Sequence, residues 1–140
     1  MSMALIKDIL EQRNQTLSVA ESCTGGYVTS LLTRVPGVSE FFPGSIVTYS
    51  YASKEKELGV NPETLSIHGA VSQECVNEML IGCVKKFGTN AAIAISGIAG
   101  PSGGTPDKPV GTVFIGAYLK GKKSIQRFQF ETNRIRNIER

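Results

Sequence analysis

Five consecutive small and apolar residues, "AAIAI" at positions 91–95, constrain the fold of this chain more than any other segment. An extended segment that is apolar at every position, and not only at alternate positions, is typical of a strand with both faces buried. We therefore expect this strand inside a sheet, with helices packed on both sides of it.

The segments around that strand alternate between helical and extended patterns. We expect further strands at 16–20, 45–51, 110–119 and 124–130, and helices at 5–14, 28–35, 52–58 and 73–87. The segment that contains Pro62 and His68 is predicted to be a loop, and the last two strands are predicted to form an antiparallel hairpin. This order predicts an α/β fold in which a mixed β-sheet is covered by helices on both faces.

The length and composition limit the class of protein. The chain has 140 residues, which is enough for one domain with a core of its own. With 41% hydrophobic and 19% charged residues, it is predicted to be soluble and globular, not disordered. The net charge of +3 favours a small anionic ligand but includes no concentrated basic stripe for duplex DNA. No apolar run approaches the length of a membrane span and no signal peptide is apparent, so neither a membrane nor a nucleic-acid partner is expected.

The cysteines and the histidine argue against disulfide and metal chemistry. Cys23, Cys75 and Cys83 are odd in number and form no C-x-x-C pair, so we expect reduced thiols and a cytoplasmic location. The single histidine, His68, has no cysteine or carboxylate near it at ligand spacing. No metal and no cofactor are expected.

Two glycine-rich segments each follow a predicted strand: "ESCTGG" at 21–26 and "SGIAGPSGGT" at 96–105. In an open α/β sheet, ligands bind outside the carboxyl ends of the strands, and glycine lets backbone N–H groups approach an anion closely. Neither segment matches the nucleoside-triphosphate or the dinucleotide motif. One such loop can be a plain tight connection, but two in a small domain favour a functional site.

Ser22, in the first of these loops, is a candidate nucleophile if a base can take its proton. His68 lies in an unpromising segment, whereas Lys54 follows the strand 45–51 and can act as a base if burial lowers its pKa. Tyr49 is a candidate proton relay. The charged composition of "SKEKE" by itself indicates a surface lysine. Cys23 is a rival nucleophile, although a free cysteine is often only a small buried residue.

Seven segments carry, in this order, a resemblance to a known family: "VAESCTGG", "VPGVSEFFPG", "IVTYS" with Lys54, "LGV", "HGAVS", "ISGIAGPSGGT" and "KPVGTVFIG". From about residue 17 to residue 118 the chain resembles the CinA C-terminal domain, also called the nicotinamide-nucleotide amidases (PncC). The resemblance implies a three-layer α/β/α sandwich. We expect one such domain over residues 1–140, with its C-terminal helix truncated.

The activity implied by the resemblance is hydrolysis of nicotinamide mononucleotide to nicotinic acid mononucleotide and ammonia, without a metal. By position, Ser22 is the nucleophile, Lys54 its base and Tyr49 a supporting relay. The backbone N–H groups from Cys23 to Gly26 are expected to form an oxyanion hole. The remaining substrate contacts are assigned to the two loops: Cys23, Thr24, Gly25 and Gly26 in the first, and Ser96, Gly97, Gly100, Gly103, Gly104 and Thr105 in the second.

The chain also departs from the family pattern. The arginine expected after the last strand, within a "GDR"-like motif, is either Arg134 or Arg136, and the "GD" is missing. Ser45 and Tyr51 replace a common glycine and asparagine. These departures support an alternative, a catalytically impaired nucleotide-binding or competence-associated module. The sequence leaves the oligomeric state open, although small domains of this kind often form homo-oligomers.

Overall fold

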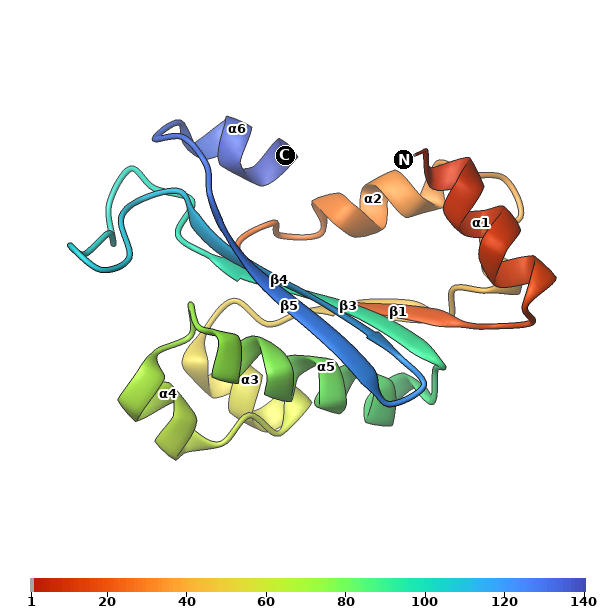
Figure 1. Ribbon diagram of the computed structural model, residues 1–140, viewed down its shortest axis with the longest axis horizontal. Helices are drawn as coiled ribbons and strands as arrows, with labels where there is room; N and C mark the ends of the chain where they lie inside the picture. The colour runs from red at the N-terminus through yellow and green to blue at the C-terminus, as the bar shows by residue number, and fades with distance from the viewer. Residues whose placement is uncertain (1) are drawn as a thin grey trace.

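The computed structural model, which describes residues 2–140, has a five-stranded sheet between two layers of helices (Figure 1). The strand order is β2-β1-β3-β4-β5. β1 pairs in parallel with β2 and β3, whereas β4 pairs antiparallel with β3 and β5. The strands are β1 (Leu17–Glu21), β2 (Gly44–Val47), β3 (Ala91–Gly97), β4 (Thr112–Leu119) and β5 (Lys122–Gln129). The predicted mixed sheet and the three-layer α/β/α sandwich are confirmed.

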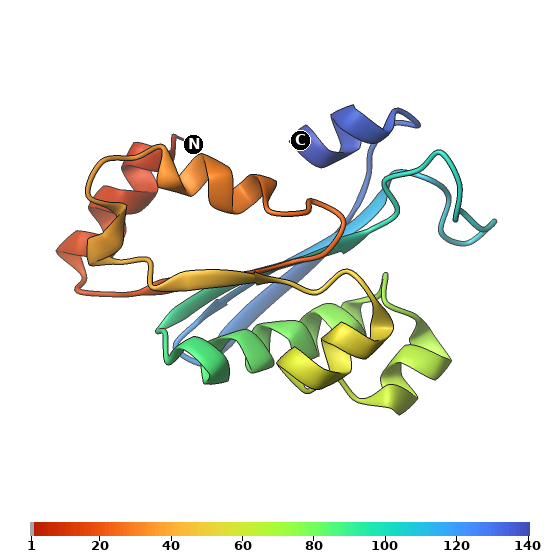
Figure 2. The ribbon, with the colours of Figure 1, turned by 180° about the vertical axis from the view of Figure 1, so that it is seen from behind.

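Within residues 2–140, six α-helices cover the two faces of the sheet (Figures 1 and 2). One face carries α1 (Met3–Gln12), α2 (Tyr27–Thr33) and α6 (Arg134–Glu139). The other carries α3 (Tyr51–Leu58), α4 (Pro62–His68) and α5 (Gln73–Phe87), and a 3₁₀ turn spans Val38–Glu40. Among residues 2–140, no helix has the length and apolarity needed to cross a membrane.

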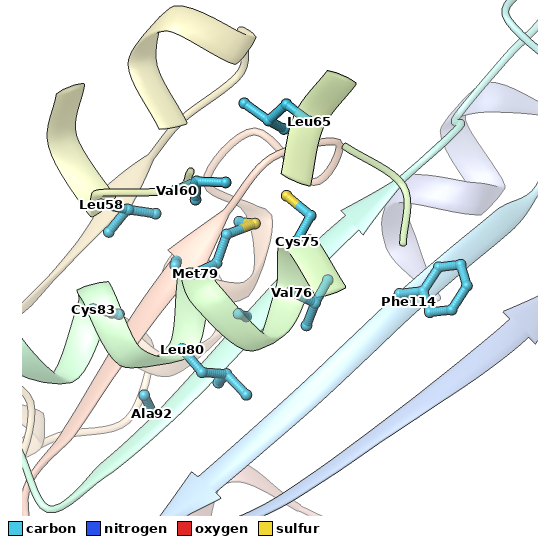
Figure 3. Packing of buried hydrophobic residues seen from close by; sticks show 12 residues of the cluster. Leu58, Val60, Leu65, Cys75, Val76, Met79, Leu80, Cys83, Ala92 and Phe114 are labelled. Carbon is cyan, nitrogen blue, oxygen red and sulfur yellow. The ribbon is translucent and has the colours of Figure 1, made fainter. Parts of the chain in front are cut away.

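The central strand β3 separates the two cores. Ala92 and Ala94 belong to the cluster that packs against α5, whereas Ile95 belongs to the cluster beneath α1 and α2. Figure 3 shows Met79 and Leu80 of α5 on the side of the helix that faces the sheet. Every position of "AAIAI" therefore contributes to packing, which is why it tolerates no polar alternation.

Two sequence predictions about local structure are wrong, and both concern helix starts. The segment with Pro62 is helix α4, because the Asn61 side chain accepts a hydrogen bond from the Glu63 N–H at 2.9 Å and proline suits the first helical position. The strand predicted at 45–51 ends at Val47, and a reciprocal capping box between Ser50 and Ser53 begins α3 instead. This early start places Lys54 on a helix that packs against the sheet.

Candidate active site

Ser22 and Lys54 meet at the carboxyl edge of β1. The Lys54 Nζ donates to Ser22 Oγ at 2.9 Å and to the carbonyl oxygen of Thr48 at 2.6 Å. Ser22 is 7% exposed and Lys54 only 1%. The surface position indicated by the charged composition around Lys54 is therefore wrong: the helix turns this one lysine inward while Lys56 remains exposed.

The surroundings of Lys54 favour the neutral form of its amine. Burial lowers the pKa of Lys54 below its ordinary value of 10.5, and the Cys75 and Cys23 thiols oppose this only in part. The two oxygens that accept from its amine are both uncharged. Within residues 2–140, no carboxylate forms an ion pair with it. A lysine in such a place can act as a base for the hydroxyl that it contacts.

Three hydroxyl residues lie side by side at the carboxyl ends of three neighbouring parallel strands: Ser22 and Thr48 directly follow β1 and β2, and Ser96 is the next-to-last residue of β3. Ala20 is paired with Ile46 on β2 and with Ala94 on β3, and two residues further along stand Ser22, Thr48 and Ser96. Because side chains alternate along a strand, all three belong to the α5 face. Thr48 and Ser96 are buried, and the Thr48 hydroxyl has no hydrogen-bond partner among the described residues. The floor of the candidate site is therefore polar.

The loop after Ser22 uses some of its N–H groups internally. The Gly25 N–H donates to the Ser22 carbonyl at 3.1 Å, and the Gly26 N–H donates to a carboxylate oxygen of Glu21 at 2.9 Å. Within residues 2–140, the N–H groups of Cys23 and Thr24 donate to no backbone carbonyl, and the Cys23 N–H contacts only the thiol of its own residue. Of the four N–H groups expected to form the oxyanion hole, the two of Cys23 and Thr24 therefore remain candidates.

The Cys23 side chain points away from Ser22 into the core beneath α1 and α2. Its sulfur packs so closely under Gly97 that a Cβ atom on that glycine would lie 3.1 Å from Sγ. Burial raises the pKa of the Cys23 thiol to about 11, so it is protonated near neutral pH. The thiol is thus a core side chain, and only the backbone of Cys23 remains a candidate for substrate contact.

One of the two candidate arginines reaches the site. The Arg134 guanidinium donates to the Tyr49 hydroxyl at 2.8 Å and to the Gly100 carbonyl at 2.6 Å, so it links the loop after β2 to the second glycine-rich loop. Arg136 instead pairs with Glu131 at 3.1 Å, on the surface. Tyr49 is 57% exposed and, within residues 2–140, forms no hydrogen bond with Ser22 or Lys54. The contact with Arg134 does not place it as a relay between them.

The glycines of the second loop fall into two groups. At Gly97, Gly100 and Gly104 a Cβ atom would lie within 2.7 Å of Val110 or Val113, so close packing explains these three. Gly103 and Thr105 line a hollow of about 400 Å³ between this loop and the segment 69–71, which connects α4 to α5. Of the loop residues predicted to bind substrate, these two are the ones that border open space there.

Comparison with known proteins identifies the family of this chain. The family model of the CinA C-terminal domain matches residues 2–140. The chain belongs to the CinA C-terminal domain family. This CinA domain is 46% identical over 134 residues to a CinA-like protein of Dictyoglomus thermophilum and 47% identical over 135 residues to one of Kosmotoga olearia. Those matches cover 94% and 95% of this chain but 33% of each relative, so the chain spans about a third of their length.

Solved structures of CinA proteins have the same fold. The competence damage-inducible protein A of Klebsiella pneumoniae superposes with a TM-score of 0.94 at 36% identity, covering 98% of this chain and 85% of that one. The competence/damage inducible protein CihA of Agrobacterium tumefaciens superposes with a TM-score of 0.94 at 33% identity, covering 97% and 84%.

The departures from the family pattern lie in different places. Ser45 is on the α2 face of β2, where its Oγ is 2.7 Å from Thr29 Oγ1, away from Lys54. Tyr51 lines the 400 Å³ hollow, and its hydroxyl accepts from the Ala70 N–H at 3.3 Å. Of these two residues, only Tyr51 borders the hollow. His68 forms an ion pair with Glu74 at 3.8 Å, if protonated, and does not contact Ser22.

Glu21 is a residue of the site that the sequence interpretation missed. It is fully buried, and hydrogen bonds from Thr24, Thr29 and Val28 outweigh the effect of burial, so the pKa of its carboxyl group is lowered. The signal was a carboxylate directly after the predicted strand 16–20 and directly before the candidate nucleophile. Among residues 2–140, no three His, Cys, Asp or Glu side chains come together in a way that would hold a metal ion.

Proposed function

We propose that this CinA domain hydrolyses the carboxamide of nicotinamide mononucleotide, forming nicotinic acid mononucleotide and ammonia. The observation that carries the proposal is the 2.9 Å contact between Ser22 Oγ and the Nζ of a buried lysine whose pKa is lowered. A hydroxyl beside an amine that gives up its proton easily is one of the pairings that allow nucleophilic attack on an amide.

The chemistry follows from this contact. Neutral Lys54 takes the proton of the Ser22 hydroxyl as its oxygen attacks the carboxamide carbon. The negative charge that develops on the carboxamide oxygen is stabilised by the N–H groups of Cys23 and Thr24. Protonated Lys54 then gives its proton to the leaving nitrogen, which departs as ammonia and leaves an ester on Ser22. Water hydrolyses the ester, with Lys54 taking and returning a proton, and releases the nucleotide acid.

The rest of the nucleotide needs a partner for its phosphate. Arg134 is the candidate, because it borders the second glycine-rich loop and a guanidinium has further N–H donors beyond the two that it uses here. The hollow lined by Tyr51, Gly103 and Thr105 is formed by the same glycine-rich loop that Arg134 contacts and offers space for the sugar and phosphate.

The direct test is incubation of the full-length protein with nicotinamide mononucleotide and EDTA, followed by assays of ammonia and nicotinic acid mononucleotide. We expect equal amounts of both products, and none above background with Ser22→Ala. If wild-type protein gives no more product than Ser22→Ala, the proposal fails.

A second candidate, a binding module without catalysis, is favoured by one observation: Tyr51 occupies the wall of the hollow where the family pattern has a smaller amide. Calorimetry separates the two candidates. Heat of binding without any ammonia release supports the module, and turnover excludes it.

A further inference from the structure

The carboxylate of Glu21 lies directly beside the candidate nucleophile in sequence but on the opposite face of the sheet. Glu21 is the last residue of β1, and its backbone carbonyl accepts from the Thr48 N–H at 2.9 Å. Its side chain is 0% exposed and points toward α2, whereas Ser22 points toward Lys54. Burial of a carboxylate destabilises the fold unless hydrogen-bond donors surround it.

Donors do surround it. One oxygen, Oε2, accepts from Thr24 Oγ1 at 2.5 Å, from the Gly26 N–H at 2.9 Å and from the Val28 N–H at 3.2 Å. The other, Oε1, accepts from the Thr29 N–H at 2.9 Å and from Thr29 Oγ1 at 2.6 Å. All of these donors belong to the segment from 24 to 29, so one side chain fixes the loop and the first turn of α2 together.

This arrangement replaces an ordinary helix cap. The N-cap position of α2 is Gly26, in a left-handed conformation and with no side chain to accept a hydrogen bond. A serine or aspartate at that position would cap the helix locally. Capping from β1 instead ties the helix to the strand that ends in Ser22, so the loop between them cannot shift relative to the nucleophile without breaking the hydrogen bonds to Glu21.

We infer that Glu21 is a positioning residue that holds the 22–26 loop in the shape in which the Cys23 and Thr24 N–H groups can stabilise the oxyanion. The inference rests on the proposed amide hydrolysis. Glu21 binds the Gly26 N–H and the Thr24 hydroxyl, and the Ser22 carbonyl accepts from the Gly25 N–H, which leaves the N–H groups of Cys23 and Thr24 for substrate. Preorganised donors of this kind accelerate a reaction because they need no rearrangement as charge develops.

Glu21→Gln tests this role. The variant keeps the shape of the side chain but turns one acceptor oxygen into a donor, which then faces a donor of the loop or of Thr29. We expect kcat to fall by about 100-fold while KM changes by less than about threefold, the pattern of a lost transition-state interaction. Asn61→Ala, which removes the cap of α4 far from the loop, is the matched control. It should lower the melting temperature but leave kcat unchanged.

A second readout separates this inference from the proposed function. The rate at which a fluorophosphonate probe labels Ser22 depends on the loop but not on any nucleotide. If nicotinamide mononucleotide is not hydrolysed, slower labelling of Glu21→Gln than of wild type still supports the positioning role. Wild-type protein that neither hydrolyses the nucleotide nor reacts with the probe would overturn both.

Three other results would overturn the inference alone. The first is a kcat and a labelling rate of Glu21→Gln that both stay within about twofold of wild type. The second is a rise in KM with unchanged kcat. The third is a loss of activity that is fully explained by a smaller fraction of folded protein. If Glu21→Gln does not fold, Thr24→Val serves in its place. It removes one donor to Oε2 and keeps the Thr24 N–H, and we expect it to lower kcat by about tenfold.

Discussion

Two fully buried ionisable side chains flank Ser22 from opposite faces of the sheet, and their surroundings differ. Glu21 accepts hydrogen bonds from three backbone N–H groups and two hydroxyls, and its pKa is lowered, so it keeps its charge. Lys54 contacts two uncharged oxygens, and burial lowers its pKa, so it gives up its charge easily. Burial disfavours both charges, and the number of hydrogen bonds decides which one persists. The fixed charge determines the shape of the loop, and the labile one is available for proton transfer.

The largest expected effect comes from removing the labile group. Lys54→Met keeps a buried chain of similar length but has no amine, so kcat/KM should fall by about 10²- to 10⁴-fold. The melting temperature should be unchanged or higher, because an amine without an ion pair no longer has to be buried. Lys56→Met, on the exposed side of the same helix, is the control and should retain full activity. Residual activity of Lys54→Met within tenfold of wild type would remove the lysine from the mechanism.

The next largest expected effect is on KM, and it distinguishes the two arginines after β5. Arg134→Ala should raise KM by about 10- to 100-fold, because charge-assisted hydrogen bonds to the phosphate are lost. Arg136→Ala should change KM little, since this side chain lies on the surface and pairs with Glu131. Steady-state kinetics with nicotinamide mononucleotide measures both. Equal effects of the two substitutions would contradict the assignment of Arg134 to the phosphate.

The pH dependence separates the two buried groups. Only neutral Lys54 can accept a proton, so kcat/KM should fall about tenfold for each pH unit below the pKa of Lys54, which lies below 10.5. The Glu21 carboxyl has a folded-state pKa below 4.5, so its contribution to stability is present above pH 4.5 and is lost as the pH falls through that lower value. In Glu21→Gln the melting temperature should therefore decrease less at acid pH than in wild type, whereas in Lys54→Met it should decrease as in wild type. If kcat/KM of Lys54→Met still rises with pH as it does in wild type, the assignment of this pH dependence to Lys54 is contradicted.

The smallest effect is expected at Cys23, which lies on the Glu21 side of the sheet. Cys23→Ala should keep activity within about threefold, and lower stability by about 1 kcal/mol because it removes a buried sulfur from the core. Since the pKa of this thiol is about 11, iodoacetamide should alkylate it slowly at neutral pH. A folded but inactive Cys23→Ala variant would move the nucleophile from the hydroxyl to the thiol.

The fold was more predictable from sequence than the site. The run of apolar residues at 91–95 predicted a central strand, because burial on both faces leaves no other pattern. The position of Lys54 was not predictable from the charged residues around it. The Ser50–Ser53 capping box determines where α3 begins and therefore which of its lysines faces inward. Residue order also cannot distinguish Arg134 from Arg136, because the two differ only in where their side chains extend. Glu21 was visible in the sequence, but the donors it binds come together only in the folded chain.

The most direct test of the account is to trap the intermediate. Full-length protein is mixed with nicotinamide mononucleotide and quenched in acid within a turnover, and the peptide that contains both Ser22 and Cys23 is analysed by fragmentation mass spectrometry. The account predicts the acyl group of the nucleotide on the Ser22 oxygen, in wild-type protein and in Cys23→Ala. An acyl group on the cysteine sulfur, or steady ammonia release with no acyl group on this peptide, would contradict it.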